Sequence, residues 1–285
     1  MLSIVLPKGS LEQTIMTLFQ DADLTVRRDS DREYRAAIDD PRIGEVRILR
    51  PQEIPMYVAK GFFDLGVTGL DWILETDSDV VELLDMSRPV RLVLAAAATC
   101  PAKTGSELKP GSRISTEYPN ITRRYFEKLG LPVEIFLSYG ATEAKVPDIA
   151  DAVVELTETG STLRQNGMKI IDTVLTSSTR LIINRDAYAD SKKRAEAEDI
   201  RTLLAGTLAA RGRVLVKLNV AENDLEPVIA VLPAMKAPTV SKLFGTGYYA
   251  VETVVEKSSI NRLIPQLKRL GAEDILELPI TKIVD

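Results

Sequence analysis

The segment Asp151-Ala-Val-Val-Glu155-Leu-Thr-Glu-Thr159-Gly-Ser-Thr-Leu163 joins a strand, a turn and the start of a helix. The run Ala152–Leu156 is short, apolar and rich in β-branched valine, which predicts a buried strand. The Thr-Gly-Ser-Thr sequence that follows it favours a turn and caps the first turn of a helix. A strand followed directly by a helix is the building unit of a parallel α/β sheet, so this segment predicts that fold class.

The residues before this segment repeat the alternation of strand and helix. In the opening part of the chain the predicted strands are Ser3–Leu6, Glu45–Leu49 and Asp64–Val67. The predicted helices run from Ser10 to about Gln20, from Pro51 to Lys60, where Gly61 ends the helix, and onward from Leu70. This alternation indicates a first lobe built on a parallel sheet.

A second block of strands and helices surrounds the opening segment. Its predicted strands are Val90–Ala98, Arg113–Thr116, Val133–Leu137 and Ala152–Leu156, and its predicted helices are Ile121–Leu129 and Thr142–Ile149. Ile170–Leu175 and Thr179–Asn184 are predicted strands that can return the chain to the first block, before a long helix over Asp186–Arg211. A chain that leaves one lobe, builds another and returns produces a cleft, and open α/β sheets bind ligands at the carboxyl ends of their strands.

From Gly212 the pattern changes to strand, helix, strand, strand, helix, strand. The predicted elements are Val214–Val220, Asn223–Leu232, Thr239–Leu243, Tyr248–Glu256, Ile260–Leu270 and Ile275–Ile283. This order is that of a ferredoxin-like domain. We therefore predict residues 1–90 with 176–211 as lobe I, residues 91–175 as lobe II and residues 212–285 as a C-terminal α+β domain.

Composition excludes several classes of function. The 285-residue chain has a formal net charge of −5, so its overall charge favours neither a nucleic-acid partner nor an anionic membrane. It contains no histidine, which excludes His-based triads and His metal sites, and its single cysteine, Cys100, excludes an intrachain disulfide. No run approaches the ~20 apolar residues of a membrane helix, and Met1–Leu6 lacks a basic leader. We expect a cytoplasmic protein that holds any anionic ligand through local groups.

The turn after the predicted strand is a candidate phosphate site. It can offer backbone N–H groups and hydroxyls to one phosphate at a helix N-terminus, where Gly160 lets the backbone approach closely. Asp151 and Glu155 can accept hydrogen bonds from sugar hydroxyls or hold Mg²⁺. The alternative is a strand, an N-cap and a helix with no ligand, because Thr-Gly-Ser-Thr is ordinary capping sequence. The pattern is not a Walker A loop, since no Gly-Lys-Ser/Thr follows.

Short motifs along nearly the whole chain stand in the order and spacing of one known family. They are Leu6-Pro-Lys-Gly-Ser-Leu11, Leu49-Arg-Pro-Gln-Glu-Ile-Pro55, Asp64-Leu-Gly-Val-Thr-Gly-Leu-Asp71, Tyr118-Pro-Asn, Gly140-Ala-Thr-Glu143, the segment Asp151–Leu163 and Ala237-Pro-Thr-Val240. In these motifs the chain resembles ATP phosphoribosyltransferase, the first enzyme of histidine biosynthesis, in its long form. The resemblance implies an α/β fold with a two-lobed catalytic part like a type II periplasmic binding protein, and a C-terminal ferredoxin-like (ACT-like) α+β domain.

The resemblance also implies a reaction. N1 of the ATP adenine would be joined to C1 of the ribose of phosphoribosyl pyrophosphate, with release of pyrophosphate and a requirement for Mg²⁺. Adenine N1 carries no proton to remove, so the enzyme has to align the substrates and stabilise charge, and a general base is not needed. A chain without histidine suits that task. The family further implies feedback inhibition by histidine and a homo-oligomer between dimer and hexamer, with no need for a separate regulatory subunit.

Residue assignments follow from the same motifs. The resemblance implies catalytic roles for Lys8, Arg50, Asp151 and Glu155, of which Asp151 and Glu155 are also the candidate Mg²⁺ ligands. It implies phosphoribosyl pyrophosphate binding by Thr157, Thr159, Gly160, Ser161, Thr162 and Leu163, and ATP binding by Gly9, Thr68, Gly69, Asp71, Tyr118 and Glu143. It implies histidine binding by Asn219, Met235, Thr239 and Asp274. Ser10 departs from many relatives, which have Arg or another residue there, so phosphate contacts at this turn can differ.

Two other functions stay open at this point. A type II solute-binding protein that captures a small anion would share the two-lobed plan, although the lack of an export signal and the paired carboxylates argue against it. A ligand-sensing interaction protein without catalysis would share the ACT-like domain. Release of pyrophosphate from ATP and phosphoribosyl pyrophosphate would separate the enzyme from both.

Overall fold

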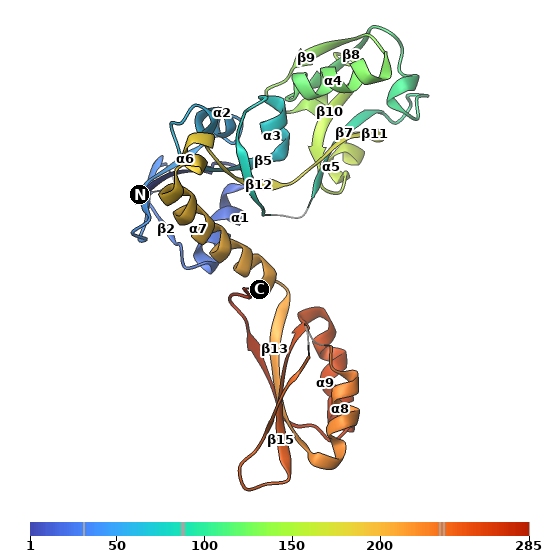
Figure 1. Ribbon diagram of the computed structural model, residues 1–285. Helices are drawn as coiled ribbons and strands as arrows, with labels where there is room; N and C mark the ends of the chain where they lie inside the picture. The colour runs from blue at the N-terminus through green and yellow to red at the C-terminus, as the bar shows by residue number, and fades with distance from the viewer. Residues whose placement is uncertain (31, 87–88, 234, 236, 285) are drawn as a thin grey trace. The chain divides into compact units, whose positions relative to one another are not determined.

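A computed structural model describes residues 1–30, 32–86, 89–233, 235 and 237–284 (Figure 1). The chain divides into two compact units, one with Met1–Thr17 and Leu24–Arg201, the other with Leu18–Asp23 and the residues from Thr202 onward. This division falls inside helix α7 (Ser191–Ala210), and the predicted domain limits stay a prediction. Among the described residues, no helix combines the length and hydrophobicity that a membrane crossing requires.

Lobe I of the first unit is built on a sheet with the strand order β2-β3-β4-β1-β5-β12-β6. Its strands are β1 (Leu2–Pro7), β2 (Val26–Arg27), β3 (Arg35–Ile38), β4 (Ile43–Leu49), β5 (Leu65–Gly69), β6 (Val81–Asp85) and β12 (Thr179–Ile183). Its helices are α1 (Glu12–Asp21) up to Thr17, α2 (Ile54–Ala59), α3 (Leu70–Glu75), α6 (Arg185–Ala189) and α7 up to Arg201. The central strands β4, β1 and β5 are parallel and the remaining pairings are antiparallel. The parallel centre is the one that the strand–helix alternation predicts.

Lobe II has a second sheet, with the strand order β11-β7-β10-β8-β9. Its elements are β7 (Val90–Ala97), β8 (Ser112–Thr116), α4 (Pro119–Leu129), β9 (Val133–Leu137), β10 (Ala152–Thr157), α5 (Ser161–Gln165) and β11 (Met168–Ser177). Strands β10, β8 and β9 run parallel, and β7 pairs antiparallel with β10 and β11. The carboxyl ends of the parallel strands therefore lie together at one edge of this sheet too.

The chain crosses between the lobes twice, after β6 and after β11. The returning strand β12 enters the lobe I sheet between β5 and β6, antiparallel to both. The amide of Met86 donates to the carbonyl of Thr179 at 2.8 Å, which places the two crossing segments side by side. The predicted cleft-forming topology, with one lobe inserted into the other, is confirmed.

The second unit contains a sheet with the order β14-β15-β13-β16, in which every pairing is antiparallel. Its elements are β13 (Arg213–Ala221), α8 (Leu225–Val231), β14 (Thr239–Lys242), β15 (Tyr248–Glu256), α9 (Ile260–Arg269) and β16 (Glu273–Pro279). Helices α8 and α9 cover one face of this sheet (Figure 1). Alternate residues of β13, among them Val216 and Leu218, pack there against Val228 and Leu267. The predicted ferredoxin-like plan is confirmed.

Three predictions of local structure are wrong. Thr142–Ile149 does not form a helix, and only Thr142–Lys145 makes a short 3₁₀ turn, because Pro147 lacks a backbone donor and blocks helix continuation. The long helix over Asp186–Arg211 is split into α6 and α7 at Asp190, whose side chain accepts hydrogen bonds from two amides of the first turn of α7. Ile170–Leu175 lies in β11 and pairs with β7, so only β12 returns to lobe I.

Candidate active site

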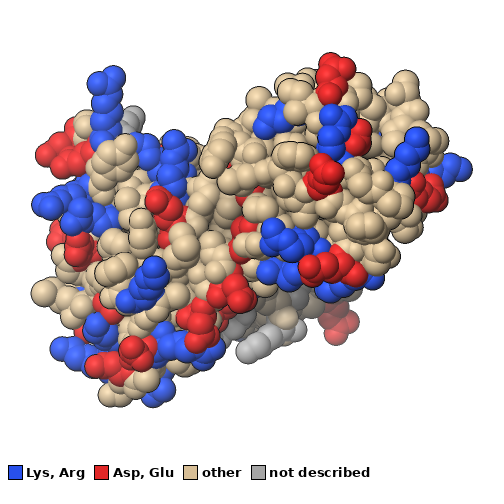
Figure 2. Space-filling model, turned by 90° about the horizontal axis from the view of Figure 1, so that it is seen from above, with Lys and Arg blue, Asp and Glu red and all other residues tan. Residues whose placement is uncertain are grey.

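A cavity of about 710 Å³ lies between the two lobes of the first unit. Its walls come from the segments that follow the parallel strands of both lobes and from the two crossing segments. The volume lies in the range of pockets that hold small-molecule ligands. On the face shown in Figure 2, Lys and Arg are interspersed with Asp and Glu, with no extended area of one sign. The face in view therefore has no area of one charge that would attract an anion.

Lys8, Gly9 and Arg50 lie together after strands β1 and β4 of lobe I, outside the cavity lining. Strands β1 and β4 are parallel neighbours with Pro7 opposite Leu49, so the residues after them lie side by side. The backbone of Gly9 has φ +95°, and a Cβ there would lie 3.9 Å from Nη1 of Arg50. The Lys8 ammonium lies 4.3 Å from the centroid of the Tyr34 ring. The two cationic residues thus belong to the same turns of lobe I as Ser10 and Gln52, which line the cavity.

Thr68, Gly69 and Asp71 form the turn after β5. The buried Thr68 hydroxyl donates to the carbonyl of Pro51 at 2.8 Å. A Cβ on Gly69 would lie 2.1 Å from Oδ1 of Asp71, so the turn has room only for glycine. Asp71 is buried and bonded to Ser177 twice: its amide donates to Ser177 Oγ at 3.0 Å, and Ser177 Oγ donates to Asp71 Oδ1 at 2.6 Å. A carboxylate of lobe I is therefore fixed by the second crossing segment.

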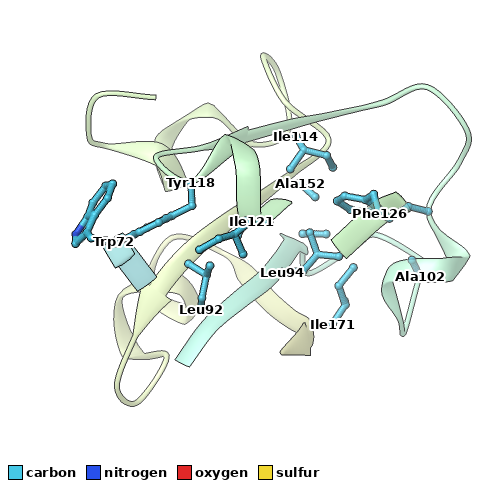
Figure 3. Close-up of a cluster of buried hydrophobic side chains, with 13 residues drawn as sticks. Trp72, Leu92, Leu94, Ala102, Ile114, Tyr118, Ile121, Phe126, Ala152 and Ile171 are labelled. Carbon is cyan, nitrogen blue, oxygen red and sulfur yellow. The ribbon is translucent and has the colours of Figure 1, made fainter. Parts of the chain in front are cut away.

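Trp72 and Tyr118 form an aromatic wall beside Asp71. Their ring centroids are 4.4 Å apart, and Figure 3 shows the two rings side by side at one end of the lobe II core. Trp72 is on α3 but packs in the same buried cluster as Leu92 and Leu94 of β7. Burial raises the pKa of the Tyr118 hydroxyl, and the hydrogen-bonded Asp71 carboxylate raises it further, so Tyr118 stays a neutral donor.

Glu155 is the third residue from the end of strand β10, and it lines the cavity. Its Oε1 accepts the amide of Leu156 at 3.2 Å. Burial raises the pKa of Glu155, and the charges of Glu117 and Glu143 raise it further, while a hydrogen bond from Thr142 opposes them. Glu117 also lines the cavity, and burial raises the pKa of that carboxyl as well. This wall of the cavity is therefore acidic and partly dehydrated.

The predicted phosphate turn follows directly after β10. Gly160 has φ +71° and stands before α5, and its amide donates to Thr157 Oγ1 at 2.8 Å. Thr159 Oγ1 donates to Ser161 Oγ at 3.1 Å. Thr162 is exposed, whereas the Leu163 side chain is buried against Val93, Val153 and Met168 and anchors the short helix. Thr157 lines the cavity, and any ligand contact of Leu163 has to come from its backbone.

Asp151 lies at the other end of the same strand. Three residues of strand lie between Asp151 and Glu155, and four rises of about 3.3 Å place their Cα atoms about 13 Å apart. Both Asp151 oxygens face Arg113, with Nη2 to Oδ1 at 3.0 Å and the Arg113 amide to Oδ2 at 2.8 Å. Hydrogen bonds from Arg113 lower the pKa of Asp151. The structure does not bring Asp151 into the cavity with Glu155.

The arrangement of the carboxylates shows which of them could hold a Mg²⁺ ion. Within the described ranges, no group of three His, Cys, Asp or Glu side chains is arranged to hold an ion. Asp151 and Glu155 are too far apart to share one. Mg²⁺, however, usually keeps several waters and is held by one or two carboxylates together with substrate phosphates. Glu155 and Glu117 fit that role at the cavity wall, because both are acidic side chains that face it.

Of the predicted residues, only Gly69, Asp71, Tyr118, Glu155 and Thr157 line the cavity. Glu143 is in the short 3₁₀ turn after β9, near enough to Glu155 to raise the pKa of that group. In the second unit, Asn219 Nδ2 donates to Asp274 Oδ2 at 2.9 Å. The strand register places Asn219 and Thr239 on the sheet face opposite α8 and α9, and Met235 is 48% exposed. Three of the four predicted effector residues therefore share one region of the ferredoxin-like sheet.

Sequence reasoning missed several cavity residues. They are Leu11, Thr14, Gln52, Trp72, Pro89, Val90, Glu117, Leu156, Glu158, Ser177, Ser178 and Thr179. Glu117 directly precedes the Tyr118-Pro-Asn motif and follows a predicted strand, so its position was a usable signal. The residues of the two crossing segments, such as Val90 and Ser178, have no such signal in the sequence, because they reach the cavity only when the chain returns from lobe II.

Comparisons with known proteins agree along the whole chain. The family model described as ATP phosphoribosyltransferase matches residues 50–206, and the one described as HisG, C-terminal domain, matches residues 210–282. An ATP phosphoribosyltransferase of Desulforudis audaxviator is 45% identical over 289 residues, with 99% of both chains covered. Another, of Chlorobium luteolum, is 44% identical over 290 residues, with 100% of this chain and 98% of the relative covered.

A solved structure supports the same assignment. The ATP phosphoribosyl transferase (HisG:HisZ) complex from Thermotoga maritima aligns with a TM-score of 0.62 and 26% identity, over 72% of this chain and 98% of that chain. The matches favour an enzyme of the pentosyltransferase class over a solute-binding protein or a non-catalytic sensor. By sequence, domain content and fold, this chain belongs to the ATP phosphoribosyltransferase family.

Proposed function

We propose that this chain joins ATP and phosphoribosyl pyrophosphate to form phosphoribosyl-ATP and pyrophosphate, the first step of histidine biosynthesis. The observation that carries the proposal is the cavity between the lobes, with complementary groups on its two sides. The lobe II side has Glu155 and Thr157, which begins the turn before α5, and the lobe I side has Ser10 and Gln52, which lie two residues along the chain from Lys8 and Arg50. Two phosphorylated substrates that react with each other need such opposed binding surfaces.

The chemistry requires alignment and charge stabilisation. A bond forms between adenine N1 and ribose C1 as the bond from C1 to the pyrophosphate oxygen breaks, and the electron pair leaves with pyrophosphate. N1 uses its lone pair, so no base has to remove a proton at this step. Positive charge develops on the ribose, and negative charge develops on the leaving group. The acidic wall of the cavity has the sign that the ribose requires, and Lys8 and Arg50, in the turns that hold Ser10 and Gln52 of the lining, have the sign that pyrophosphate requires.

We assign the residues accordingly. The turn formed by Thr157, Thr159, Gly160, Ser161 and Thr162 binds the 5′-phosphate of phosphoribosyl pyrophosphate, with the buried Leu163 as its anchor. Glu155 accepts hydrogen bonds from the ribose hydroxyls and supports positive charge on the ring.

The other side of the cavity receives ATP and the leaving group. Lys8 and Arg50 neutralise pyrophosphate, and ATP binds along Gly9, Thr68, Gly69, Asp71, Tyr118 and Glu143. Asp151 serves the site indirectly, through Arg113 and the start of β10.

Mg²⁺ belongs to the proposal as a companion of the substrate phosphates. Glu155 and Glu117 are the carboxylates that would hold it, together with pyrophosphate oxygens and water. When bound, the ion would neutralise charge on the leaving pyrophosphate. The protein side chains then have only to orient the ribose and the adenine.

We further propose that histidine inhibits the enzyme by binding to the second unit. Asn219, Thr239 and Asp274 present polar groups on one region of its sheet, and Met235 lies in the loop before β14. Because the unit is part of the same chain, no separate regulatory subunit is required. We expect a homo-oligomer between dimer and hexamer, which light scattering would measure. Thr239→Ala is expected to weaken inhibition with turnover retained, and unchanged inhibition would remove Thr239 from the effector site.

Pyrophosphate release is the direct test of the activity. The purified protein is mixed with ATP, phosphoribosyl pyrophosphate and Mg²⁺, and pyrophosphate is measured by a coupled assay while phosphoribosyl-ATP is followed by its absorbance. Mixtures without either substrate are the controls. Equal amounts of both products, dependent on both substrates, are expected. A folded protein that forms neither product would overturn the proposal.

A further inference from the structure

Ser177, the last residue of β11, is joined to the start of helix α3 by two hydrogen bonds. The amide of Asp71 donates to Ser177 Oγ at 3.0 Å, and Ser177 Oγ donates to Asp71 Oδ1 at 2.6 Å. The second distance is typical of a hydroxyl bonded to a carboxylate. Ser177 is 1% exposed and Asp71 is 3% exposed, and both line the cavity. The amide therefore holds the hydroxyl in the place from which it reaches the carboxylate.

The strand register explains why these distant residues meet. β12 pairs antiparallel with β5, and Thr179 stands opposite Gly69. Just beyond this pair, the amide of Leu70 donates to the carbonyl of Ser178 at 2.9 Å. Gly69 has no side chain with which to cap α3, so Ser178 and Ser177 accept the first two amides of the helix. The start of α3 is thus capped by the second crossing segment.

The Ser177 hydroxyl is committed to Asp71. A serine hydroxyl has one proton to give, and this one goes to the Asp71 carboxylate. The amide of Asp71 occupies an acceptor position on the same oxygen. The side chain is also almost wholly buried, which leaves little of it for contact with a substrate. Ser177 therefore acts on a ligand through the place that it gives to Asp71 Oδ1.

The carboxylate of Asp71 selects the part of ATP that can lie against it. An aspartate carboxylate accepts hydrogen bonds and repels other anions. The triphosphate of ATP is anionic, whereas its donors are the ribose hydroxyls and the adenine amino group. Trp72 and Tyr118 line the cavity beside Asp71, and aromatic rings pack well against other aromatic rings such as adenine. This wall of the cavity therefore suits the adenosine part of ATP.

We propose that Ser177 is a positioning residue that holds the Asp71 carboxylate in place to accept a hydrogen bond from the adenosine part of ATP. This inference rests on the proposed function, in which ATP binds along Asp71. It gives a role to the second crossing segment, which the assigned substrate contacts do not include. Loss of the hydroxyl should weaken ATP binding and spare phosphoribosyl pyrophosphate, which the proposed function places on the turn after β10.

Calorimetric titration of the purified full-length chain with each substrate alone tests the proposal. Ser177→Ala should raise the dissociation constant for ATP about tenfold. Ser177→Cys keeps a side chain of similar shape but donates only weakly, so it should raise this constant about threefold to tenfold. Ser112→Ala is the matched control, because Ser112 is a buried serine of lobe II whose hydroxyl donates to the carbonyl of Lys109 at 2.7 Å. It should stay within twofold of wild type, and no variant should change the constant for phosphoribosyl pyrophosphate by more than twofold.

A double-mutant cycle shows whether Ser177 acts through Asp71. In an Asp71→Ala background, Ser177→Ala is expected to change the dissociation constant for ATP by less than twofold, because the hydroxyl then has no carboxylate to hold. Changes that multiply, unaltered ATP binding by Ser177→Ala, or equal weakening of both substrates would overturn the proposal. If neither Ser177→Ala nor Ser177→Cys is folded at the assay temperature, Ser177 has a structural role only and the proposal fails. Failure of the proposed function looks different, since the wild-type protein would then release no pyrophosphate.

Discussion

Replacing Glu75 should weaken the contact by which helix α3 holds helix α4. Helix α4 starts after Tyr118, which provides no side-chain cap, and Pro119 has no N–H group. The amides of Asn120 and Ile121 are therefore the first that need partners. Both donate to Glu75, from Asn120 at 2.9 and 3.1 Å and from Ile121 at 2.9 Å. Glu75 is 6% exposed, so its carboxylate caps α4 out of contact with most of the solvent.

The size of the effect follows from these bonds. Glu75→Ala leaves the amide of the buried Ile121 and the amide of the exposed Asn120 without an acceptor. The first should cost roughly 1–3 kcal/mol and the second less, and a negative charge is removed from a helix N-terminus, so about 2–4 kcal/mol should be lost. Glu75→Gln keeps one carbonyl acceptor and should cost about 1–2 kcal/mol. At roughly 2–4 °C per kcal/mol for a unit of this size, the melting temperature should fall by about 2–8 °C for Gln and about 4–16 °C for Ala.

Tryptophan fluorescence during thermal unfolding measures the melting temperature of the first unit directly. Trp72 is the only tryptophan of the chain and lies on α3, so its emission follows the unfolding of the first unit. Glu127→Gln is the matched control, because Glu127 is exposed on α4 and its loss should change stability by less than about 0.5 kcal/mol. A Glu75→Ala protein with the same melting temperature as the Glu127→Gln protein would refute the capping argument.

Further changes test other parts of the structure. Gly160→Ala is expected to weaken phosphoribosyl pyrophosphate binding at least tenfold in calorimetric titration, because the backbone has φ +71° and an added Cβ would lie 3.0 Å from a neighbouring isoleucine; undiminished affinity would contradict it. Glu155→Gln should lower kcat tenfold to hundredfold, since a hydrogen bond to a charged group is worth roughly 1.5–3 kcal/mol, whereas Asp151→Asn should leave kcat within threefold of wild type; equal losses in steady-state kinetics would place both carboxylates at the chemistry. In the wild-type protein a 2.6 Å hydrogen bond from Tyr125 lowers the pKa of Asp172 from 3.8, while burial raises the pKa of Tyr125. Tyr125→Phe removes this hydrogen bond. A lowered Asp172 pKa stabilises the folded state above about pH 4, and this stabilisation is lost as the pH falls through the folded-state pKa. In urea unfolding, the free energy of unfolding of Tyr125→Phe should therefore be about 1 kcal/mol below that of the wild type at pH 7, and the difference should shrink at pH 3. A difference that does not change with pH would exclude the linkage.

Much of the fold could be predicted because its signals are local. Alternation of apolar strands with capped helices lies within short stretches of chain, and strand β15 has the predicted limits Tyr248–Glu256. Lys8 and Arg50 could be expected at one edge, because the carboxyl ends of adjacent parallel strands always meet there. The family motifs carried the remaining assignments, which no local pattern contains.

Local errors came from competition between signals. The apolar pattern over Thr142–Ile149 has helical spacing, but a proline at position 147 prevents continuation of the turn. The charged stretch from Asp186 suits one long helix, yet Asp190 caps a new one through its side chain. In both cases a single residue outweighs the average preference of its neighbours.

The sequence by itself determined the class of each domain, the order of the elements and the turn that follows β10. Only the tertiary structure decided that Asp151 is paired with Arg113, whereas Glu155 lines the cavity. It also decided that Trp72 packs with lobe II, and that Asp71 is held by Ser177, which is 106 residues further along the chain. The physical reason is that periodicity and capping are properties of neighbouring residues, whereas these contacts form only when distant segments close on one another and bury their polar groups together.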